Sequence, residues 1–436
     1  MADLTYRRNL ELIRLLGRLG WTPERLAREV NEVVGAQRAI NATTPYHWRD
    51  RGRVPREPYG QVVCEVLGRA LGSPVSYAQL WQRRDDPEGP HALDIPLVEV
   101  PWTPEAAIAA LTLAVDHAAD PARPGDLLSA NALHQAGQRW QHSSARPPSG
   151  EGPLRIGRAH LGALRLAWHA KCRLDSGYGG SLVRDPLREE VRFGAGLLRH
   201  GGYDEETGRS LYGLTAALAR LAGWACYDCG EHATAQRYYL AALRAAHISG
   251  DRVLGAGVLG CLAAQASDTG DPRDAVALLS SALGGGGSDL PAPDWALLYG
   301  RMALAHGLLR DPYAVRDHAA QAFGRLEREP RPYPRERAEL HGLVGEAYLA
   351  LDECAEAVGH LETAVRSADP RQARARALLL VRLAEAYRRT GRAKEAAEAL
   401  GEAERLGAGM RSPRVDAVLA DHRRRFAPPA SSPHAE

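Results

Sequence analysis

A short arginine-rich segment, residues 43–56, holds the side chains best suited to chemistry in this sequence. Hydroxyl, imidazole and guanidinium groups surround one tryptophan, Trp48. Arginine reads guanine in the major groove, threonine or tyrosine contacts phosphate or a thymine methyl group, and further arginines suit phosphates. If Trp48 anchors a helix in a domain core, its neighbours face outward. The segment therefore predicts DNA contacts by Thr43, Thr44, Tyr46, His47, Arg49, Arg51, Arg53 and Arg56.

The charge of the chain is unevenly distributed. The whole chain of 436 residues has a formal net charge of +2, but residues 1–84 contain 14 Arg against 8 Asp and Glu. The remainder carries a small excess of acid. A basic head on a slightly acidic body is typical of a nucleic-acid-binding module attached to another domain.

Composition argues against several other classes of protein. No run of about 18 apolar residues occurs, so we expect no membrane span. The first residues lack the basic-then-apolar plan of a secretion signal. Six cysteines are too sparse and irregular for a disulfide framework. These features predict a cytoplasmic protein.

The basic segment belongs to a region of short amphipathic stretches. Apolar residues recur at helical spacing over 10–19, 26–33 and 62–71, and Thr22 with Pro23 is a good helix start. We expect four or five short helices in a helix-turn-helix DNA-binding domain over 1–84. Prolines interrupt the pattern over 85–103, which predicts a stiff linker.

Repeats dominate the rest of the chain. Alanines and tyrosines recur at similar offsets, with Gly230 and Gly270 40 residues apart and Tyr348 and Tyr387 39 apart. The unit resembles a lengthened tetratricopeptide repeat, in which small residues let paired helices approach closely. The sequence predicts an all-α fold: the head, degenerate helical repeats over 104–209, a tetratricopeptide-like α-solenoid over 210–426, and a disordered tail over 427–436. Almost no strand is expected, and 143–153 is expected to be a mobile loop.

The head resembles the helix-turn-helix of Xre/Cro-type repressors. The segment Gly20-Trp21-Thr22, followed by Leu26 and Ala27, matches the first helix of that motif, and Trp48, Gly52 and Pro55 match the end of the recognition helix. Two features depart from the family: the long connection 31–40, and Pro45 at a position where relatives have an apolar residue. The alternative is a basic, solvated face on a degenerate fold.

Most of the chain also resembles a group of actinobacterial regulators, some of which restrain sporulation and antibiotic production. The resemblance rests on the turn 174–180 (LDSGYGG), the stretch 221–230 (LAGWACYDCG) and 235–238 (AQRY). It implies a DNA-binding head joined to tetratricopeptide repeats, acting as a homodimer on double-stranded DNA. A peptide, small molecule or protein would bind in the repeat groove, without a cofactor or metal. The architecture is also similar to that of peptide-pheromone receptors.

Other motifs have structural explanations that we favour. Trp224, Tyr227 and Gln265 would line the groove if they face its concave side, or would pack between repeats. The pattern G-x-G-x-x-G over 255–260 lacks a preceding strand, so it indicates close helix packing rather than a dinucleotide site. Cys226 and Cys229 have no second ligand pair at zinc spacing. Nothing indicates an enzyme.

Two functions remain from the sequence. The first is a sequence-specific DNA-binding transcriptional regulator, with repeats for dimerisation and signal sensing. The second is a tetratricopeptide adaptor that binds a protein or peptide without reading DNA. The salt dependence of DNA binding distinguishes the two functions, because a phosphate-binding protein loses affinity for DNA steeply as ionic strength rises.

Overall fold

The chain divides into two compact units, Met1–Gly89 and Pro90–Glu436, each described separately below. The computed structural model describes residues 9–35, 39–51, 53, 55–56, 58–71, 75, 80–81, 100–119, 127–143, 145, 148–328 and 334–426. Most of the expected linker, 85–99, and the expected tail, 427–436, lie outside these ranges. Helices account for nearly all regular structure in the described residues. The prediction of an all-α helical-repeat fold is confirmed.

The first unit is a small helical domain with its own apolar core. Leu26, Val30, Trp48 and Val63 are buried in that core. The apolar spacing of the sequence predicts the helices well, because only their buried stripes are apolar. The described helices include α1 (Leu10–Leu19), α2 (Pro23–Val34), α3 (Thr44–Arg51) and α4 (Tyr59–Leu71), and Leu80 and Trp81 are also helical.

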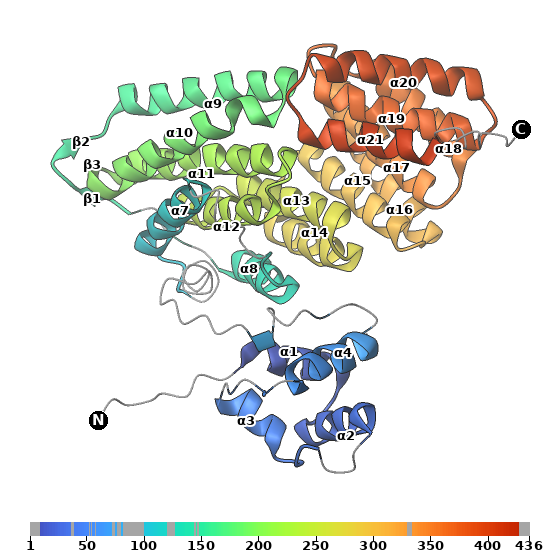
Figure 1. Cartoon of the computed structure of the whole chain (residues 1–436). Helices are drawn as coiled ribbons and strands as arrows, with labels where there is room; N and C mark the ends of the chain where they lie inside the picture. The colour runs from blue at the N-terminus through green and yellow to red at the C-terminus, as the bar shows by residue number, and fades with distance from the viewer. Residues whose placement is uncertain are drawn as a thin grey trace, which may run out of the picture. The chain divides into compact units, whose positions relative to one another are not determined.

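The second unit is built from consecutive helical hairpins (Figure 1). Within each hairpin two antiparallel helices pack together, and each hairpin packs on the next. The hairpin helices are α9 (Arg158–Tyr178) with α10 (Gly180–His200), α11 (Glu205–Asp228) with α12 (His232–Ser249), α13 (Arg252–Thr269) with α14 (Pro272–Gly286), α15 (Ala292–Leu308) with α16 (Pro312–Glu327), α17 (Pro334–Ala350) with α18 (Cys354–Ser367), and α19 (Ala373–Arg389) with α20 (Ala393–Ala408). A short 3₁₀ turn, η1 (Gly287–Asp289), follows α14, and α21 (Pro413–Phe426) ends the array.

The region expected to hold degenerate repeats, 104–209, is only partly repetitive. Helix α7 (Pro104–Ala119) packs against α10 and α12, whereas α8 (Ala130–His142) packs against α14. Between them and α11 lie three short strands, β1 (Gly150–Glu151), β2 (Leu154–Arg155) and β3 (Gly201–Tyr203). Strand β3 is central, antiparallel to β1 and parallel to β2. The mobile loop expected over 143–153 thus contains part of a sheet, which two-residue strands do not reveal in a hydrophobic pattern.

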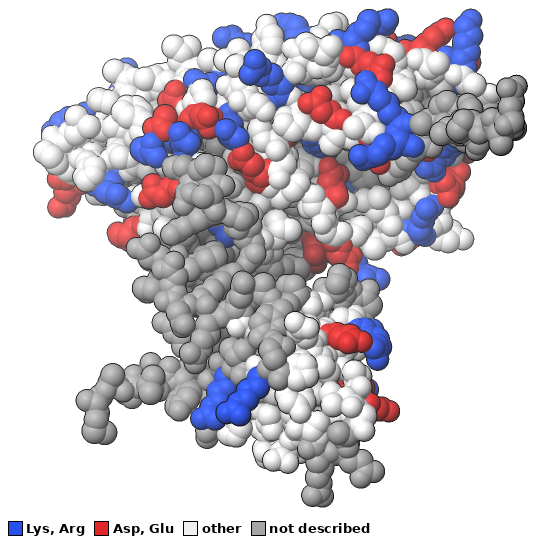
Figure 2. Space-filling view, viewed as in Figure 1, with Lys and Arg blue, Asp and Glu red and all other residues white. Residues whose placement is uncertain are grey.

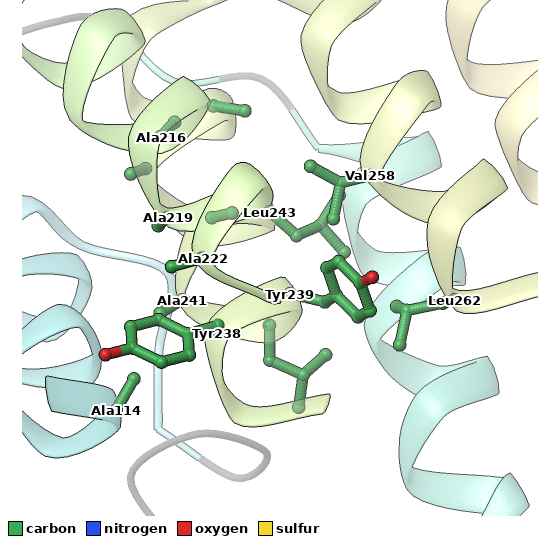
Figure 3. Close-up of a cluster of buried hydrophobic side chains, with 14 of the residues drawn as sticks. Ala114, Ala216, Ala219, Ala222, Tyr238, Tyr239, Ala241, Leu243, Val258 and Leu262 are labelled. Carbon is green, nitrogen blue, oxygen red and sulfur yellow. The ribbon is translucent and has the colours of Figure 1, made fainter. Parts of the chain in front are cut away.

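The core of the second unit centres on α12, which is buried on every side. Figure 3 shows Tyr238 pointing toward Ala114 of α7 while Tyr239 lies between Val258 and Leu262 of α13. A helix that contacts neighbours all round carries apolar or small residues on every face. Alanine is therefore frequent in α12, because it lets the surrounding helices approach closely.

The glycines of α13 confirm that the G-x-G-x-x-G pattern serves packing. A Cβ atom at Gly255 would lie 2.3 Å from the indole nitrogen of Trp140 on α8. At Gly257 it would lie 2.8 Å from the Arg220 guanidinium, and at Gly260 3.1 Å from Leu298. All three glycines lie within one helix that follows α12, so the strand that a dinucleotide site requires is missing.

A buried ion cluster joins the beginning of the hairpin array to its end. Arg374 of α19 donates two hydrogen bonds to Asp175 of α9, at 2.7 and 2.5 Å, and lies 3.4 Å from Asp228 of α11. Asp228 also accepts hydrogen bonds from the Gly180 backbone and the Ser412 hydroxyl, both at 2.8 Å. Burial opposes the charge of Arg374, but the two carboxylates raise its pKa above the ordinary value. We call Asp175, Asp228, Arg374 and Ser412 the closing cluster.

The turn between α9 and α10 is shaped to reach this cluster. Gly179 has a φ of 92°, and a Cβ atom there would lie 2.5 Å from the carbonyl oxygen of Arg411. At Gly180 a Cβ would lie 2.6 Å from the carbonyl oxygen of Ala225. The Arg411 backbone N–H donates to Tyr178 at 2.8 Å. The turn at Gly179 and Gly180 therefore needs both glycines, because backbone from α11 and from the segment before α21 lies against it. Residues 174–178, expected in this turn, are instead the last residues of α9.

Removing the arginine of the closing cluster is expected to destabilise the second unit strongly. Arg374→Ala leaves two carboxylates buried without a counter-charge, which costs about 3–5 kcal/mol. Chemical denaturation followed by circular dichroism measures the change in the free energy of unfolding. Arg371→Ala is the matched control, because this guanidinium is 90% exposed and pairs with Asp369 at the surface. Equal stability of the two variants would contradict the role of the cluster.

Paired histidines lie along the later hairpins. The rings of His306 and His318 are 5.1 Å apart, and those of His341 and His360 are also 5.1 Å apart. The Nδ1 atoms of His341 and His360 approach to 3.0 Å, so one ring must donate and the other accept. Burial and the neighbouring His360 lower the pKa of His341 to about 4, and burial lowers the pKa of His360. Both groups therefore oppose protonation in the folded state.

The histidine pair predicts a loss of stability in mild acid. Below about pH 6.5 the histidines bind protons in the unfolded chain but not in the folded protein, because their pKa is lowered by folding. The free energy of unfolding therefore falls as the pH drops toward about 4. We expect His341 alone to lower the free energy of unfolding by about 1–2 kcal/mol when the pH falls from about 7 to about 5. Urea unfolding of the wild type and of His341→Gln/His360→Gln at both pH values tests this. The same pH dependence in both proteins would exclude the histidine pair as its cause.

Candidate nucleic-acid interface

The helix that precedes the arginine-rich segment begins where the sequence predicts but runs to Val34, into the connection expected over 31–40. The Thr22 side chain accepts a hydrogen bond from the Arg25 backbone at 3.3 Å, and Pro23 occupies the first turn of α2. The helix ends at Gly35, whose φ of 71° is left-handed. These caps fix both ends of α2.

One side chain of α2, Asn31, binds the backbone at the far end of the connection that leads to α3. Asn31 donates to the carbonyl of Ile40 and accepts from its backbone N–H, both at 2.9 Å. Ile40 is buried in the core of the unit. The connection therefore delivers the chain to the start of α3 at a defined place, despite its length.

Helix α3 is anchored by its tryptophan, as predicted. Trp48 is 4% exposed and meets the ring of Trp81 edge to face, with 5.9 Å between ring centroids. Pro45 is also buried, in the first turn of α3. Thr44 is the first residue of the helix. The other predicted contact residues are thereby kept at or near the surface.

Two of the predicted DNA-contacting residues are engaged within the domain. The Tyr46 hydroxyl donates to Glu24 of α2, and this hydrogen bond raises the pKa of Tyr46 and lowers that of Glu24. Arg49 donates to both carboxylate oxygens of Asp50, at 2.9 and 2.7 Å, which raises the pKa of Arg49. The Arg49 guanidinium also lies 4.7 Å from the centre of the Tyr46 ring. The Tyr46–Glu24 bond links α3 to α2, whereas the Arg49–Asp50 bonds lie within α3.

The remaining predicted residues are more available. Thr43, Arg53 and Arg56 are exposed, whereas Thr44 and His47 are half-buried. Neither arginine forms an ion pair with any described residue, and the His47 ring forms no hydrogen bond there. The Arg51 side chain lies outside the described residues. The structure thus brings the predicted set together around α3 and its following segment but divides it into engaged and available groups.

Residues of α2 that no sequence motif singled out belong to the same region. Glu24 holds Tyr46, and Arg25 lies 4.8 Å from the centre of the Trp21 ring. Arg28 is exposed and has no ion-pair partner among the described residues. A helical projection of α2 shows that Arg25 and Arg28 are three residues apart on one face, but the pairing of Glu24 depends on how α3 is placed.

The three residues expected to line a groove in the repeats are mostly interior. Gln265 is 1% exposed and donates to the carbonyl of His232 at 2.8 Å. Tyr227 is 2% exposed, and its hydroxyl donates to Asp268 while Arg414 lies over its ring. Trp224 is half-buried beside Tyr227 and Arg374. The groove interpretation is therefore wrong for Tyr227 and Gln265, because neighbouring helices and the end of the array cover them.

The cysteine pair also packs within the repeats. Burial raises the pKa of both Cys226 and Cys229, and all six cysteines are free thiols. No group of three or more metal-ligating side chains occurs among the described residues. In the same part of the chain, no helix is both long and apolar enough to cross a bilayer.

Comparison with known proteins finds similarity in each unit. The family model described as SP15 N-terminal domain matches residues 12–80. No curated protein matches the chain. Among solved structures, the crystal structure of BtubC (BKLC) from P. vanneervenii is 16% identical, with a TM-score of 0.35, and the match covers 63% of this chain and 95% of that one.

The position of α3 is expected to depend on its buried tryptophan. Trp48→Ala removes a large core side chain that also contacts Trp81, which costs about 3–5 kcal/mol. Limited proteolysis of the full-length chain should release the second unit much earlier in this variant than in the wild type. His47→Ala, on the same helix, is the control and should be cleaved at the wild-type rate. Unchanged cleavage of Trp48→Ala would contradict the anchoring role.

Proposed function

We propose that this protein is a sequence-specific DNA-binding transcriptional regulator of the cytoplasm, with a helix-turn-helix in its first unit. The observation that carries the proposal is a tryptophan-anchored α3 followed by the exposed, unpaired arginines Arg53 and Arg56, in a segment of positive net charge. Unpaired surface arginines can neutralise DNA phosphates without first breaking an ion pair. His47 and Thr43 lie on or beside α3 and are the best placed to contact bases or backbone.

Tyr46 has a positioning role in this proposal. The Tyr46–Glu24 hydrogen bond holds α3 against α2, which fixes the angle at which α3 would enter the major groove. Arg49 pairs with Asp50 of its own helix. Arg49 could contact guanine only after exchanging Asp50 for the base. The hairpin unit would provide dimerisation and response to a peptide, small molecule or protein signal, and the homodimer would place two α3 helices about one turn of DNA apart, roughly 34 Å.

A second candidate is a repeat adaptor that binds a protein or peptide and does not read DNA. It is favoured by the same internal pairing of Tyr46 and Arg49, since two of the side chains most suited to base contacts are already satisfied. The salt dependence of DNA binding separates the candidates.

Neutralising the available arginines should weaken DNA binding in a salt-dependent way. DNA fragments are selected with the full-length protein, and the affinity of one selected duplex is measured by fluorescence anisotropy over a range of salt. Each lost phosphate contact should reduce the slope of log K against log salt by about 0.9, so Arg53→Ala/Arg56→Ala should reduce it by about 2.

The matched control is Arg366→Ala/Arg371→Ala, which removes two exposed arginines from the second unit. It should retain the wild-type affinity and slope. Wild-type slope in Arg53→Ala/Arg56→Ala, or failure of the full-length protein to enrich any sequence, would reject the proposal in favour of the adaptor.

A further inference from the structure

Helix α9 presents an uncovered apolar face to solvent. Its described side chains are buried at only two positions, Leu164 and Asp175. Leu166 is 69% exposed and Leu174 38% exposed. Several of the large apolar side chains that are exposed elsewhere in the second unit belong to the adjoining α10, where Leu182 and Phe193 are 43% and 47% exposed. A soluble protein rarely concentrates exposed apolar residues in one hairpin without a binding role.

Small and apolar residues of α9 form one continuous stripe, which is exposed except at the half-buried Ala170. Ala159, Ala163, Leu166, Ala170 and Leu174 succeed one another at intervals of three or four residues, which places them on one side of a helix. The stripe runs most of the length of α9. Alanines between leucines let another helix approach closely, while the leucines supply the apolar area.

The charges beside this stripe are of one sign. Arg158, Arg165 and Arg173 are exposed and form no ion pair or hydrogen bond with any described residue. The one acidic residue of α9, Asp175, is buried in the closing cluster. By contrast, Asp185 and Glu189 of α10 pair with arginines of their own helix. Figure 2 shows blue and white atoms along the upper-left edge of the second unit, where α9 lies in Figure 1.

We propose that the outer face of α9 binds an acidic amphipathic helix of a partner protein. The partner's apolar residues would cover Leu166 and Leu174, and its carboxylates would pair with Arg158, Arg165 and Arg173. Charge selects this occupant over a second copy of α9, because two such helices side by side would bring unpaired arginines together. The surface is independent of DNA binding by the first unit.

The probe is a labelled helical peptide of about twenty residues, long enough to follow α9. It carries leucines at helical spacing on one face and glutamates on its flanks. A second peptide has lysine in place of every glutamate. Binding of both to the full-length protein is measured by fluorescence anisotropy.

The acidic peptide should bind the wild-type protein, and Leu166→Ser should raise its Kd by about tenfold or more. Arg165→Glu/Arg173→Glu should weaken binding of the acidic peptide and strengthen binding of the lysine peptide. Mere destabilisation of the protein would not strengthen binding of either peptide. Leu308→Ser, which changes a 40% exposed leucine of α15, is the control and should bind like the wild type. Circular dichroism checks that each variant is folded.

Three results would overturn the proposal. The first is no binding of the acidic peptide, or equal binding of both peptides. The second is self-association of the wild type that Leu166→Ser abolishes in sedimentation experiments, which would assign the face to a second copy. The third is loss of duplex DNA binding in Arg165→Glu/Arg173→Glu with peptide binding unchanged, which would assign the arginines to nucleic acid.

Discussion

The pairing of Arg374 with Asp175 and Asp228 is the constraint on which the second unit depends. Hairpin repeats ordinarily contact only their neighbours, so their stability is nearly additive along the chain. Here a salt bridge joins residues 199 positions apart, and both partners are buried. The array is therefore closed on itself, and opening it would expose three charges that have few other partners. Because its two ends are linked, the array is expected to unfold as one cooperative unit rather than repeat by repeat. A change in its curvature would likewise involve all the hairpins.

The closing of the array also explains why Tyr227 is buried and lines no groove. Tyr227 and Arg414 stack where α11 meets the end of the array, and Asp268 accepts hydrogen bonds from both side chains. Polar residues in such a position resemble a ligand site, but they satisfy one another. A signal that alters the curvature of the hairpins must compete with these bonds, and its binding energy must exceed the cost of separating them. Outer surfaces such as that of α9 carry no such cost.

In the first unit, the same side chains serve both the fold and the proposed interface. Tyr46 could hold α3 in place or contact a base, and in this structure it holds α3 through Glu24 of α2, while Arg49 pairs with Asp50 of its own helix. The arginines that follow the helix are free of this conflict because they lie beyond the α2–α3 contact. In the proposed interface, phosphate contacts would come from Arg53 and Arg56, whereas the orientation of α3 depends on the Tyr46–Glu24 bond.

The sequence by itself determined the helices, their caps and the repeats. Thr22 and Pro23 start α2 and Trp48 anchors α3, because each effect depends on residues close together along the chain or on a periodic pattern. The lack of a strand before the glycines of α13 excludes a dinucleotide site, but their packing partners, such as Trp140, come from distant parts of the chain. Only the tertiary structure decided that Asp175 meets Arg374, that Tyr46 meets Glu24, and that Tyr227 is covered. No local period records such pairings, since they depend on the summed rotations of many hairpins and on the angle between two helices.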